Sequence, residues 1–209
     1  MLDNKIVLIG YSGHGLVVAE GAIQSKINLK YYTEKNEVLT NHFKLEYLGF
    51  EGDENFSYWD EPFGFILGIG NNSIRRSVGE LIVNKGKELL NVIHNSALIS
   101  DNVSIGKGNF IAKNSNVNYL ASIGDFCILN TGCTVEHECH IANGVHIAPG
   151  AVLLGNVSVG ENSFIGANTV IKENTKIGSN VIIGAGSVVL KDILDENSVW
   201  VGNPAKRIK

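Results

Sequence analysis

The 209-residue chain lacks several features that would place it in a special class. It has only three cysteines, no apolar run long enough to span a bilayer, and no charged start followed by a long apolar stretch of the kind that signal peptides carry. Its formal net charge is −4 at pH 7 without a basic stripe, so there is no electrostatic reason to expect nucleic-acid binding. These absences favour a cytoplasmic protein.

What the chain does have is an aliphatic residue at every sixth position over nearly half its length. A helical period of 3.6 cannot keep this spacing on one face, and a simple strand alternates every two residues. One short strand and one bend per hexad would instead close a three-sided coil of about 18 residues, with aliphatics stacked inside and smaller residues near the corners. The positions are Ile99, Ile105, Ile111, Val117, Ile123, Leu129, Val135, Ile141, Ile147, Leu153, Val159, Ile165, Ile171, Ile177, Ile183 and Val189.

The repeat divides the chain into two predicted domains, 1–94 and 95–209, the second ending in a short tail. Roughly five coils stacked at about 4.8 Å would fill the second domain. The hexads resemble those of left-handed parallel β-helices, and the handedness is taken from that resemblance because spacing alone does not reveal it. The aliphatic column alone does not offset the backbone entropy of ordering this domain, so we expect an oligomer, with a trimer of side-by-side prisms as the natural form.

The three cysteines, Cys127, Cys133 and Cys139, recur at the small inward position of successive hexads. We therefore expect reduced thiols that pack inside the coil, because a zinc site would normally bring histidines into the same pocket.

The first domain opens with a strand, a glycine turn and a helix. The strand covers Lys5–Ile9, the turn is G-Y-S-G-H-G at residues 10–15, and the helix covers Leu16–Ile23. Such a turn lets backbone N–H groups approach a phosphate at the positive end of a helix. The spacing G-x-x-G-x-G differs from the dinucleotide fingerprint, which weakens an interpretation as an NAD site, and the glycines alone would also fit a tight turn without a ligand.

Two further strands are predicted in this domain. Leu29–Tyr32 ends near Glu34, where nucleotide-binding folds often place an acid, and Phe63–Leu67 runs into a second glycine turn at residues 68–72 that precedes a helix from about 73 to 85. Two glycine turns at one edge of a small parallel sheet favour a truncated Rossmann-like domain that binds a ligand there. Residues 41–59 are acidic and irregular and give no usable pattern.

One hexad of the coil carries chemistry: V-E-H-E-C-H at residues 135–140. Val135 and Cys139 keep the inward register, so His137 and its flanking acids lie outside or at a corner. A carboxylate can hold one ring nitrogen and leave the other to accept a proton, as a general base requires. One coil further, Gly155 opens space beside the imidazole and bares a backbone N–H for an oxyanion. The histidines interpreted as ordinary, solvated ones are His42, His94 and His140.

Nearly the whole chain resembles a family of sugar acetyltransferases. Its members join a small nucleotide-binding domain to a left-handed β-helix, as in the UDP-4-amino-sugar N-acetyltransferases of bacillosamine synthesis and the sialic acid O-acetyltransferase-like proteins. The motifs that carry the resemblance are G-Y-S-G-H-G, I-G-N-N-S-I-R at 69–75, V-I-H-N-S-A-L-I-S at 92–100, L-N-T-G-C-T-V-E-H-E-C-H-I at 129–141 and V-G-N-P-A-K-R at 201–207.

The resemblance implies a role for each matching residue. His137 would be the general base, and Glu138 would raise its basicity. Acetyl-CoA would lie in the groove between neighbouring β-helices of a homotrimer, and the nucleotide sugar would lie on the first domain. The residues implied for acetyl-CoA are His146, Gly155, Ala167 and Ala185, and those for the nucleotide sugar are Gly10, Ser12, Gly13, His14, Glu34, Lys35 and Asn72. The family has glycine at the position of Ala185. Alanine there keeps the backbone N–H that would contact CoA, but its methyl group narrows the acetyl-CoA groove.

The predicted function is therefore direct acetyl transfer from acetyl-CoA to the amine of a nucleotide-linked 4-amino-4,6-dideoxyhexose in glycan biosynthesis, with no metal and no acyl-enzyme. Sialic acid or another sugar hydroxyl is the alternative acceptor. A trimeric zinc carbonic anhydrase on the same coil would need histidines such as His137, His140 and His146 to converge on one metal. A non-enzymatic scaffold gives no reason for the V-E-H-E cluster or the glycine turns.

Overall fold

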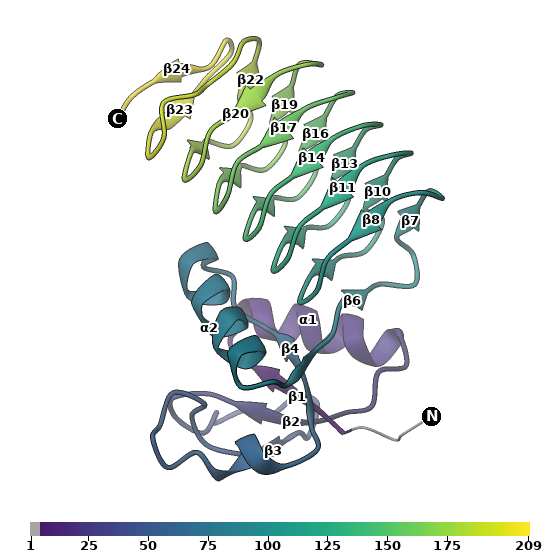
Figure 1. Ribbon diagram of the computed structural model, residues 1–209, viewed down its shortest axis with the longest axis vertical. Helices are drawn as coiled ribbons and strands as arrows, with labels where there is room; N and C mark the ends of the chain where they lie inside the picture. Colours follow the sequence, from purple (N-terminus) through teal and green to yellow (C-terminus); the bar gives the residue numbers. More distant parts are fainter. Residues whose placement is uncertain (1–4) are drawn as a thin grey trace.

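The computed structural model describes residues 5–209, so the first four residues of the predicted first domain lie outside it. A small α/β domain stands at one end of a long three-sided coil (Figure 1). Its sheet is parallel and has the strand order β3-β2-β1-β4-β5. The strands are β1 (Ile6–Ile9), β2 (Leu29–Thr33), β3 (Glu46–Tyr47), β4 (Gly64–Leu67) and β5 (Glu88–Leu89). The predicted open parallel sheet is confirmed, and β3 and β5 are additions to it.

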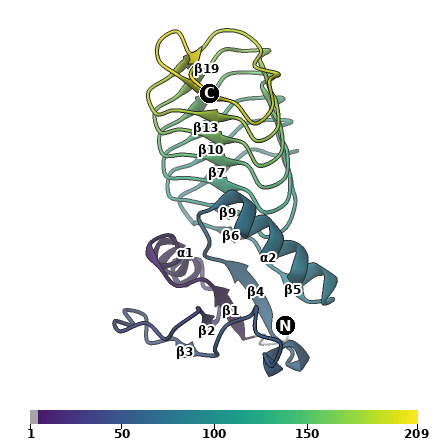
Figure 2. The ribbon, with the colours of Figure 1, turned by 90° about the vertical axis from the view of Figure 1, so that its left-hand side faces the viewer.

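The helices α1 (Gly13–Gln24) and α2 (Asn72–Asn84) pack on opposite faces of this sheet, and both also contact the coil (Figures 1 and 2). Glycines let both helices approach the coil closely. A Cβ atom at Gly21 of α1 would lie 3.1 Å from the ring of Phe110, and one at Gly79 of α2 would lie 2.5 Å from the ring of Phe126. The first domain is therefore docked on the coil through aromatic side chains of the coil itself. Among residues 5–209, no helix has the length and apolar character needed to cross a membrane.

Three parallel sheets form the sides of the coil, and each strand from β6 to β22 pairs with the strand 18 residues away. We call them the domain face, the apolar face and the polar face. The domain face comprises β6 (Val92–Ile93), β9 (Phe110–Ile111), β12 (Ile128–Leu129), β15 (His146–Ile147), β18 (Phe164–Ile165), β21 (Ile182–Ile183), β23 (Val199–Val201) and the antiparallel β24 (Lys206–Arg207). The apolar face comprises β7 (Leu98–Ile99), β10 (Asn116–Val117), β13 (Thr134–Val135), β16 (Val152–Leu153), β19 (Val170–Ile171) and β22 (Val188–Val189). The polar face comprises β8 (Ser104–Ile105), β11 (Ser122–Ile123), β14 (His140–Ile141), β17 (Ser158–Val159) and β20 (Lys176–Ile177).

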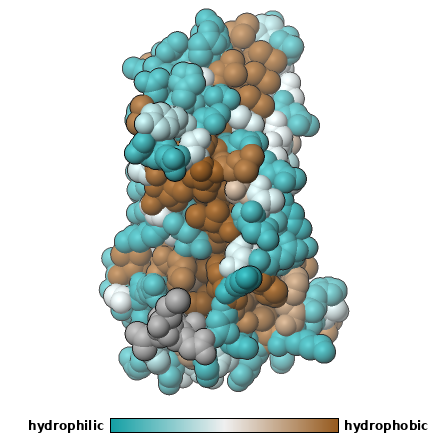
Figure 3. All heavy atoms as spheres, turned by 90° about the vertical axis from the view of Figure 1, so that its right-hand side faces the viewer, coloured by the Kyte–Doolittle hydropathy of each residue, from teal (hydrophilic) through white to brown (hydrophobic). Residues whose placement is uncertain are grey.

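In each two-residue strand the first side chain points outward and the second, an aliphatic one, points into the coil. Fourteen of the sixteen repeat aliphatics are buried, and the first two, Ile99 and Ile105, pack against the same core. The predicted hexapeptide coil is thus confirmed as a left-handed β-helix. It takes its first strand, β6, just ahead of the boundary predicted at residue 95. On the side of the molecule that Figure 3 shows, apolar side chains gather over the half of the coil next to the first domain and again near its far end.

The corners explain the many asparagines and glycines of the repeat. The third residue after each aliphatic, from Asn102 to Gly186, has a positive φ at every one of fifteen successive corners. Asparagine and glycine tolerate this left-handed conformation best, and they fill twelve of the fifteen positions. The three exceptions are Leu120, Phe126 and Glu138. Phe126 is explained by its buried packing against the first domain.

The three cysteines are free and fully buried at the predicted inward positions. Burial raises the pKa of Cys127 and Cys133 to about 12 and that of Cys139 to about 11. They are therefore protonated packing residues at neutral pH.

Candidate active site

His137 stands at the edge between the apolar and polar faces, directly after β13. Its side chain is 58% exposed, and its Nδ1 lies 3.0 Å from Oε2 of Glu138. With Nδ1 donating to the carboxylate, Nε2 carries the lone pair and is open to accept a proton. Glu138 reaches this position from a backbone with φ +60°, which is unusual for a residue other than glycine or asparagine. Strain of this kind tends to be kept at functional positions.

Gly155 follows one coil later on the same edge, and the imidazole of His137 lies over it. A Cβ atom at Gly155 would lie 2.5 Å from Cε1 and 2.6 Å from Nε2 of His137. Any side chain there would displace the ring. The backbone N–H of Gly155 donates to no acceptor within residues 5–209, so it is available to an oxyanion beside the histidine.

A second histidine pair lies at the junction between the first domain and the coil. His14 at the start of α1 and His146 on β15 have ring centroids 6.3 Å apart. Burial, reinforced by the charge of Arg75, lowers the pKa of His14 to about 4 and that of His146 to about 3. Both rings are neutral at physiological pH, and Nε2 of His14 and Nδ1 of His146 are buried without a hydrogen-bond partner among the described residues. A bound polar group could satisfy these nitrogens.

Arg75 fastens the two domains together beside this pair. It is 1% exposed and donates hydrogen bonds to the carbonyls of Phe126 (2.7 Å) and Gly144 (2.8 Å) on the coil. It also donates to the carbonyls of Ile69 and Gly70 in the second glycine turn. Burial lowers the pKa of Arg75 to about 10, so it stays charged. No role was predicted for Arg75 from the sequence, although it ends the I-G-N-N-S-I-R motif.

Asn72, predicted to face the nucleotide sugar, takes part in the same junction. Its Nδ2 donates to the carbonyls of Asn162 and Ser163 on the coil at 2.9 and 3.1 Å. An open groove of about 440 Å³ adjoins it, lined by the second glycine turn, the start of α2 and side chains such as Phe164 and Ile182. The groove opens where the first domain meets the domain face.

The structure brings the other predicted residues of the first domain to one sheet edge. Gly10 lies so close to the second turn that a Cβ at Gly68 would meet the Gly10 carbonyl at 2.2 Å, so the two glycine turns converge. Oε2 of Glu34 accepts a hydrogen bond from the backbone N–H of Tyr11 (3.1 Å), which ties the first turn to the end of β2. The remaining predicted residues at this edge are Ser12 and Gly13, which are exposed, and Lys35, which follows Glu34.

Ala167 and Ala185 stack one coil apart on the edge between the domain and apolar faces. His137 and Gly155 occupy the other edge of the apolar face. Within one copy the width of this face therefore separates Ala167 and Ala185 from His137, whereas Gly155, also predicted to contact acetyl-CoA, lies beside His137. His146 belongs to neither edge, since it projects from the domain face.

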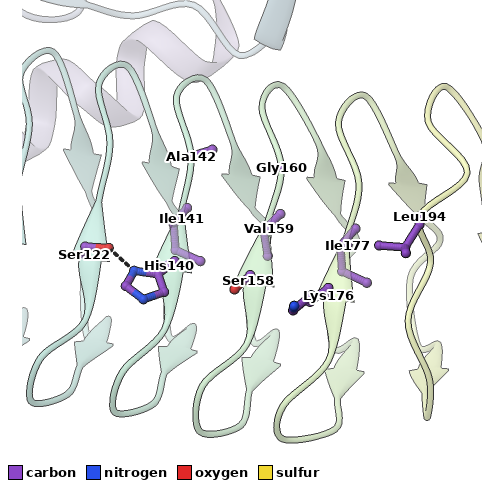
Figure 4. Close-up of a pocket in the computed structure, with 10 residues that line it drawn as sticks. All are labelled: Ser122, His140, Ile141, Ala142, Ser158, Val159, Gly160, Lys176, Ile177 and Leu194. Carbon is purple, nitrogen blue, oxygen red and sulfur yellow. Dashed lines mark hydrogen bonds between the residues drawn. The ribbon is translucent and has the colours of Figure 1, made fainter.

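His140 lies on the polar face, where its Nδ1 is 2.6 Å from Oγ of Ser122 (Figure 4). It lines an open groove of about 490 Å³ with Ser158, Lys176 and Leu194. His137, His140 and His146 thus stand on an edge, the polar face and the domain face, and they do not converge. Among residues 5–209, no group of three or more His, Cys, Asp or Glu side chains has the arrangement to hold a metal ion.

Comparison with known proteins matches both parts of the chain to family models. The model described as "PglD N-terminal domain" matches residues 5–82, and "Bacterial transferase hexapeptide (six repeats)" matches residues 121–155 and 156–191.

Solved structures match almost the whole chain. The acetyltransferase domain of PglB from Neisseria gonorrhoeae FA1090, in complex with acetyl coenzyme A, is 33% identical over 98% of this chain and 99% of that one, with a TM-score of 0.91. A mutant of perosamine N-acetyltransferase from Caulobacter crescentus, in complex with CoA and GDP-perosamine, is 29% identical over 99% of this chain and 97% of that one, with a TM-score of 0.90.

A curated relative is UDP-N-acetylbacillosamine N-acetyltransferase from Bacillus subtilis (strain 168). It is 33% identical over 119 residues, which is 51% of this chain and 50% of that protein. The matches to curated relatives span half of their length or less.

Proposed function

Because the chain belongs to the family of hexapeptide-repeat sugar acetyltransferases with a PglD-type N-terminal domain, we propose that it acetylates the amine of a nucleotide-linked 4-amino-4,6-dideoxyhexose with acetyl-CoA. The observation that carries the proposal is the geometry of His137. Its Nδ1 is held by Glu138 and its Nε2 is open over the bare backbone of Gly155. This is the arrangement of a general base beside an oxyanion donor.

The transfer proceeds in one displacement. The sugar amine attacks the thioester carbonyl carbon as Nε2 of His137 takes its proton, and the oxyanion is stabilised by the N–H of Gly155. The C–S bond then breaks, and the imidazolium returns the proton to the CoA thiolate. No acyl-enzyme forms on cysteine, because the buried thiols have pKa values of about 11 to 12.

The complete site lies between two copies of the chain in a homotrimer. One copy contributes the edge with His137 and Gly155, and its neighbour contributes the edge with Ala167 and Ala185, so that acetyl-CoA lies along the groove between them. The nucleotide sugar binds to the converging glycine turns of the first domain, where backbone N–H groups and the start of a helix suit a phosphate. His14 extends this surface towards the coil, where its ring lies 6.3 Å from that of His146, the residue predicted to contact acetyl-CoA.

An acetyl-transfer screen tests the proposal. Acetyl-CoA is offered with UDP-, GDP- and dTDP-linked 4-amino-4,6-dideoxyhexoses and with free sialic acid, and the released CoA thiol is measured. We expect turnover with one nucleotide amino sugar and intersecting double-reciprocal lines. Turnover of sialic acid alone would replace the proposal by O-acetylation, parallel lines would indicate an acyl-enzyme, and no turnover would overturn it.

A further inference from the structure

The coil immediately before His137 carries an apolar pair on the same edge. Tyr119 and Leu120 are the positions equivalent to His137 and Glu138 one coil nearer the first domain, and the backbone N–H of Glu138 donates to the carbonyl of Tyr119 (3.0 Å). Their side chains are 50% and 51% exposed. The residues that flank them on this edge one coil earlier, Asp101 and Asn102, are polar.

Leu120 has a backbone conformation that is unfavourable for leucine. Its φ is +61°, at a corner position that asparagine or glycine fills at twelve of fifteen corners. The other two exceptions have a reason in the structure, since Phe126 is buried against the first domain and Glu138 holds His137. Leu120 is exposed and gains no such packing within residues 5–209. A strained, exposed leucine beside a candidate base indicates a contact made only with a bound molecule or partner.

Tyr119 is fixed in place beside it. Its hydroxyl oxygen accepts a hydrogen bond from Nδ2 of Asn102 at 2.8 Å, which directs the ring along the edge and away from His137. The pair therefore forms a small apolar ledge, defined here as Tyr119 and Leu120, between β10 and β11 and one coil nearer the first domain than His137. Figure 1 shows β10 and β11 nearer the first domain than β13 and β14.

The acceptor is the molecule that arrives from that side. In a trimer of parallel prisms every first domain lies at the same end, so a sugar held there meets the ledge before it meets His137. Acetyl-CoA comes from the opposite direction, because Gly155, Ala167 and Ala185 all belong to later coils. The geometry thus places the ledge beside the acceptor sugar and away from the thioester.

We propose that Tyr119 and Leu120 form the acceptor-side wall of the active site and select a 6-deoxy sugar by contact with its C6 methyl group. The inference rests on the proposed function and adds the part of the substrate that the ledge recognises. Contact between an exposed apolar side chain and a methyl group contributes favourable binding free energy. A hydroxymethyl group in the same place would lose its hydrogen bonds to water without gaining a hydrogen-bond partner.

The test compares two acceptors that share a nucleotide: a 4-amino-4,6-dideoxyhexose and the 4-amino-4-deoxyhexose that retains its 6-hydroxyl. The wild type should prefer the 6-deoxy sugar by about tenfold or more in kcat/KM. Leu120→Asn places a residue that suits the positive φ, so the variant should fold and its Tm should not fall. The preference should drop towards unity through a higher acceptor KM, with the KM for acetyl-CoA unchanged.

Leu190→Asn is the control. Leu190 is 54% exposed directly after β22, at the far end of the same edge and two positions earlier in its hexad than Leu120, so its replacement should leave the preference intact. An unchanged preference in Leu120→Asn would overturn the inference. Dissociation of the Leu120→Asn oligomer in light scattering would also overturn it, because Leu120 would then belong to the contact between copies. Turnover without any preference in the wild type would overturn the inference alone, whereas no turnover of either acceptor would overturn the proposed function with it.

Discussion

At the scale of single residues, the candidate site depends on one imidazole whose two nitrogens have different environments. Replacing His137 by alanine should lower kcat by about a hundredfold or more with little change in Tm, because the side chain is exposed and packs against no core residue. His140→Ala removes a histidine of the polar face and should leave kcat near the wild-type value. Steady-state acetyl transfer measures both, and a near-wild-type rate for His137→Ala would refute the assignment.

Gly155 gives a second prediction at this scale, because its missing side chain is what lets the ring lie where it does. In Gly155→Ala the new methyl group would lie 2.5 Å from Cε1 of His137, so the ring must move and kcat should fall by about tenfold or more. The double variant with His137→Ala should be no slower than His137→Ala alone. A further loss in the double variant would show that Gly155 acts independently of the ring.

The buried histidines predict how stability depends on pH. His14 and His146 have folded-state pKa values of about 4 and about 3, below the ordinary value of 6.5, so the unfolded chain takes up protons first as the pH falls. Each should cost up to about 1.4 kcal/mol of unfolding free energy per pH unit between pH 6.5 and its folded-state pKa. Above pH 6.5 neither has an effect. Thermal unfolding at pH 8 and pH 5 should show a smaller loss of Tm in His14→Gln/His146→Gln than in the wild type. An equal loss would contradict this account.

At the scale of elements, the sequence reveals most where one residue type fixes one structural position. Each strand from β7 to β22 could be predicted because an aliphatic side chain marks it, and a positive-φ corner follows each of them except β22. The strands β6, β23 and β24 lie outside the repeat and were not predicted. In the first domain, β1, β2, β4 and both helices follow from their apolar runs. The two-residue strands β3 and β5 and the 3-10 helix Ser57–Asp60 could not be predicted, because so short a segment is defined by its neighbour and not by its own pattern.

The residues of the candidate site also divide into those that a local sequence pattern predicts and those that depend on contacts between the domains. The register of the hexads is enough to place His137 and Glu138 on the surface and Gly155 one coil later. The burial of His14 and His146 is a contact between two domains, and no local pattern contains it. Arg75 was overlooked for a related reason: an arginine in an amphipathic helix resembles a surface residue until the carbonyls that it meets are known.

Arg75 supplies the prediction that belongs to this scale. In Arg75→Met the carbonyls of Phe126 and Gly144 lose their buried donor, so the free energy of unfolding should fall by about 3 kcal/mol or more. The neighbouring Arg76 is the control, since it pairs with Glu80 and Glu161 at the surface and Arg76→Met should cost about 1 kcal/mol or less. Denaturant titration of both variants measures the difference. Similar losses would mean that Arg75 does not fasten the domains.

At the scale of the whole molecule, one copy holds the two halves of the proposed site on opposite edges of its apolar face. Four of the six outward residues of that face are apolar: Leu98 (69% exposed), Val170 (37% exposed) and the less exposed Val152 and Val188. The other two are Asn116 and Thr134. The polar face presents Ser104, Ser122, His140, Ser158 and Lys176 at the same strand positions. Since apolar surface is the surface that association removes from water, we expect the contact between copies of the proposed trimer to lie on the apolar face and to bring opposite edges together.

Val170→Lys tests this arrangement and the catalytic site at once. A lysine on β19 would place a charge within the contact between copies, so light scattering should show a shift from trimer towards monomer at micromolar concentration. Acetyl transfer should be lost in proportion, although neither edge has been altered, because His137 of one copy no longer meets the acetyl-CoA groove of the next. Ser158→Lys makes the same kind of change on the polar face and should leave both mass and activity intact. A fully active monomer would show that one copy contains the whole site, and a trimer that persists in Val170→Lys but dissociates in Ser158→Lys would assign the contact to the polar face.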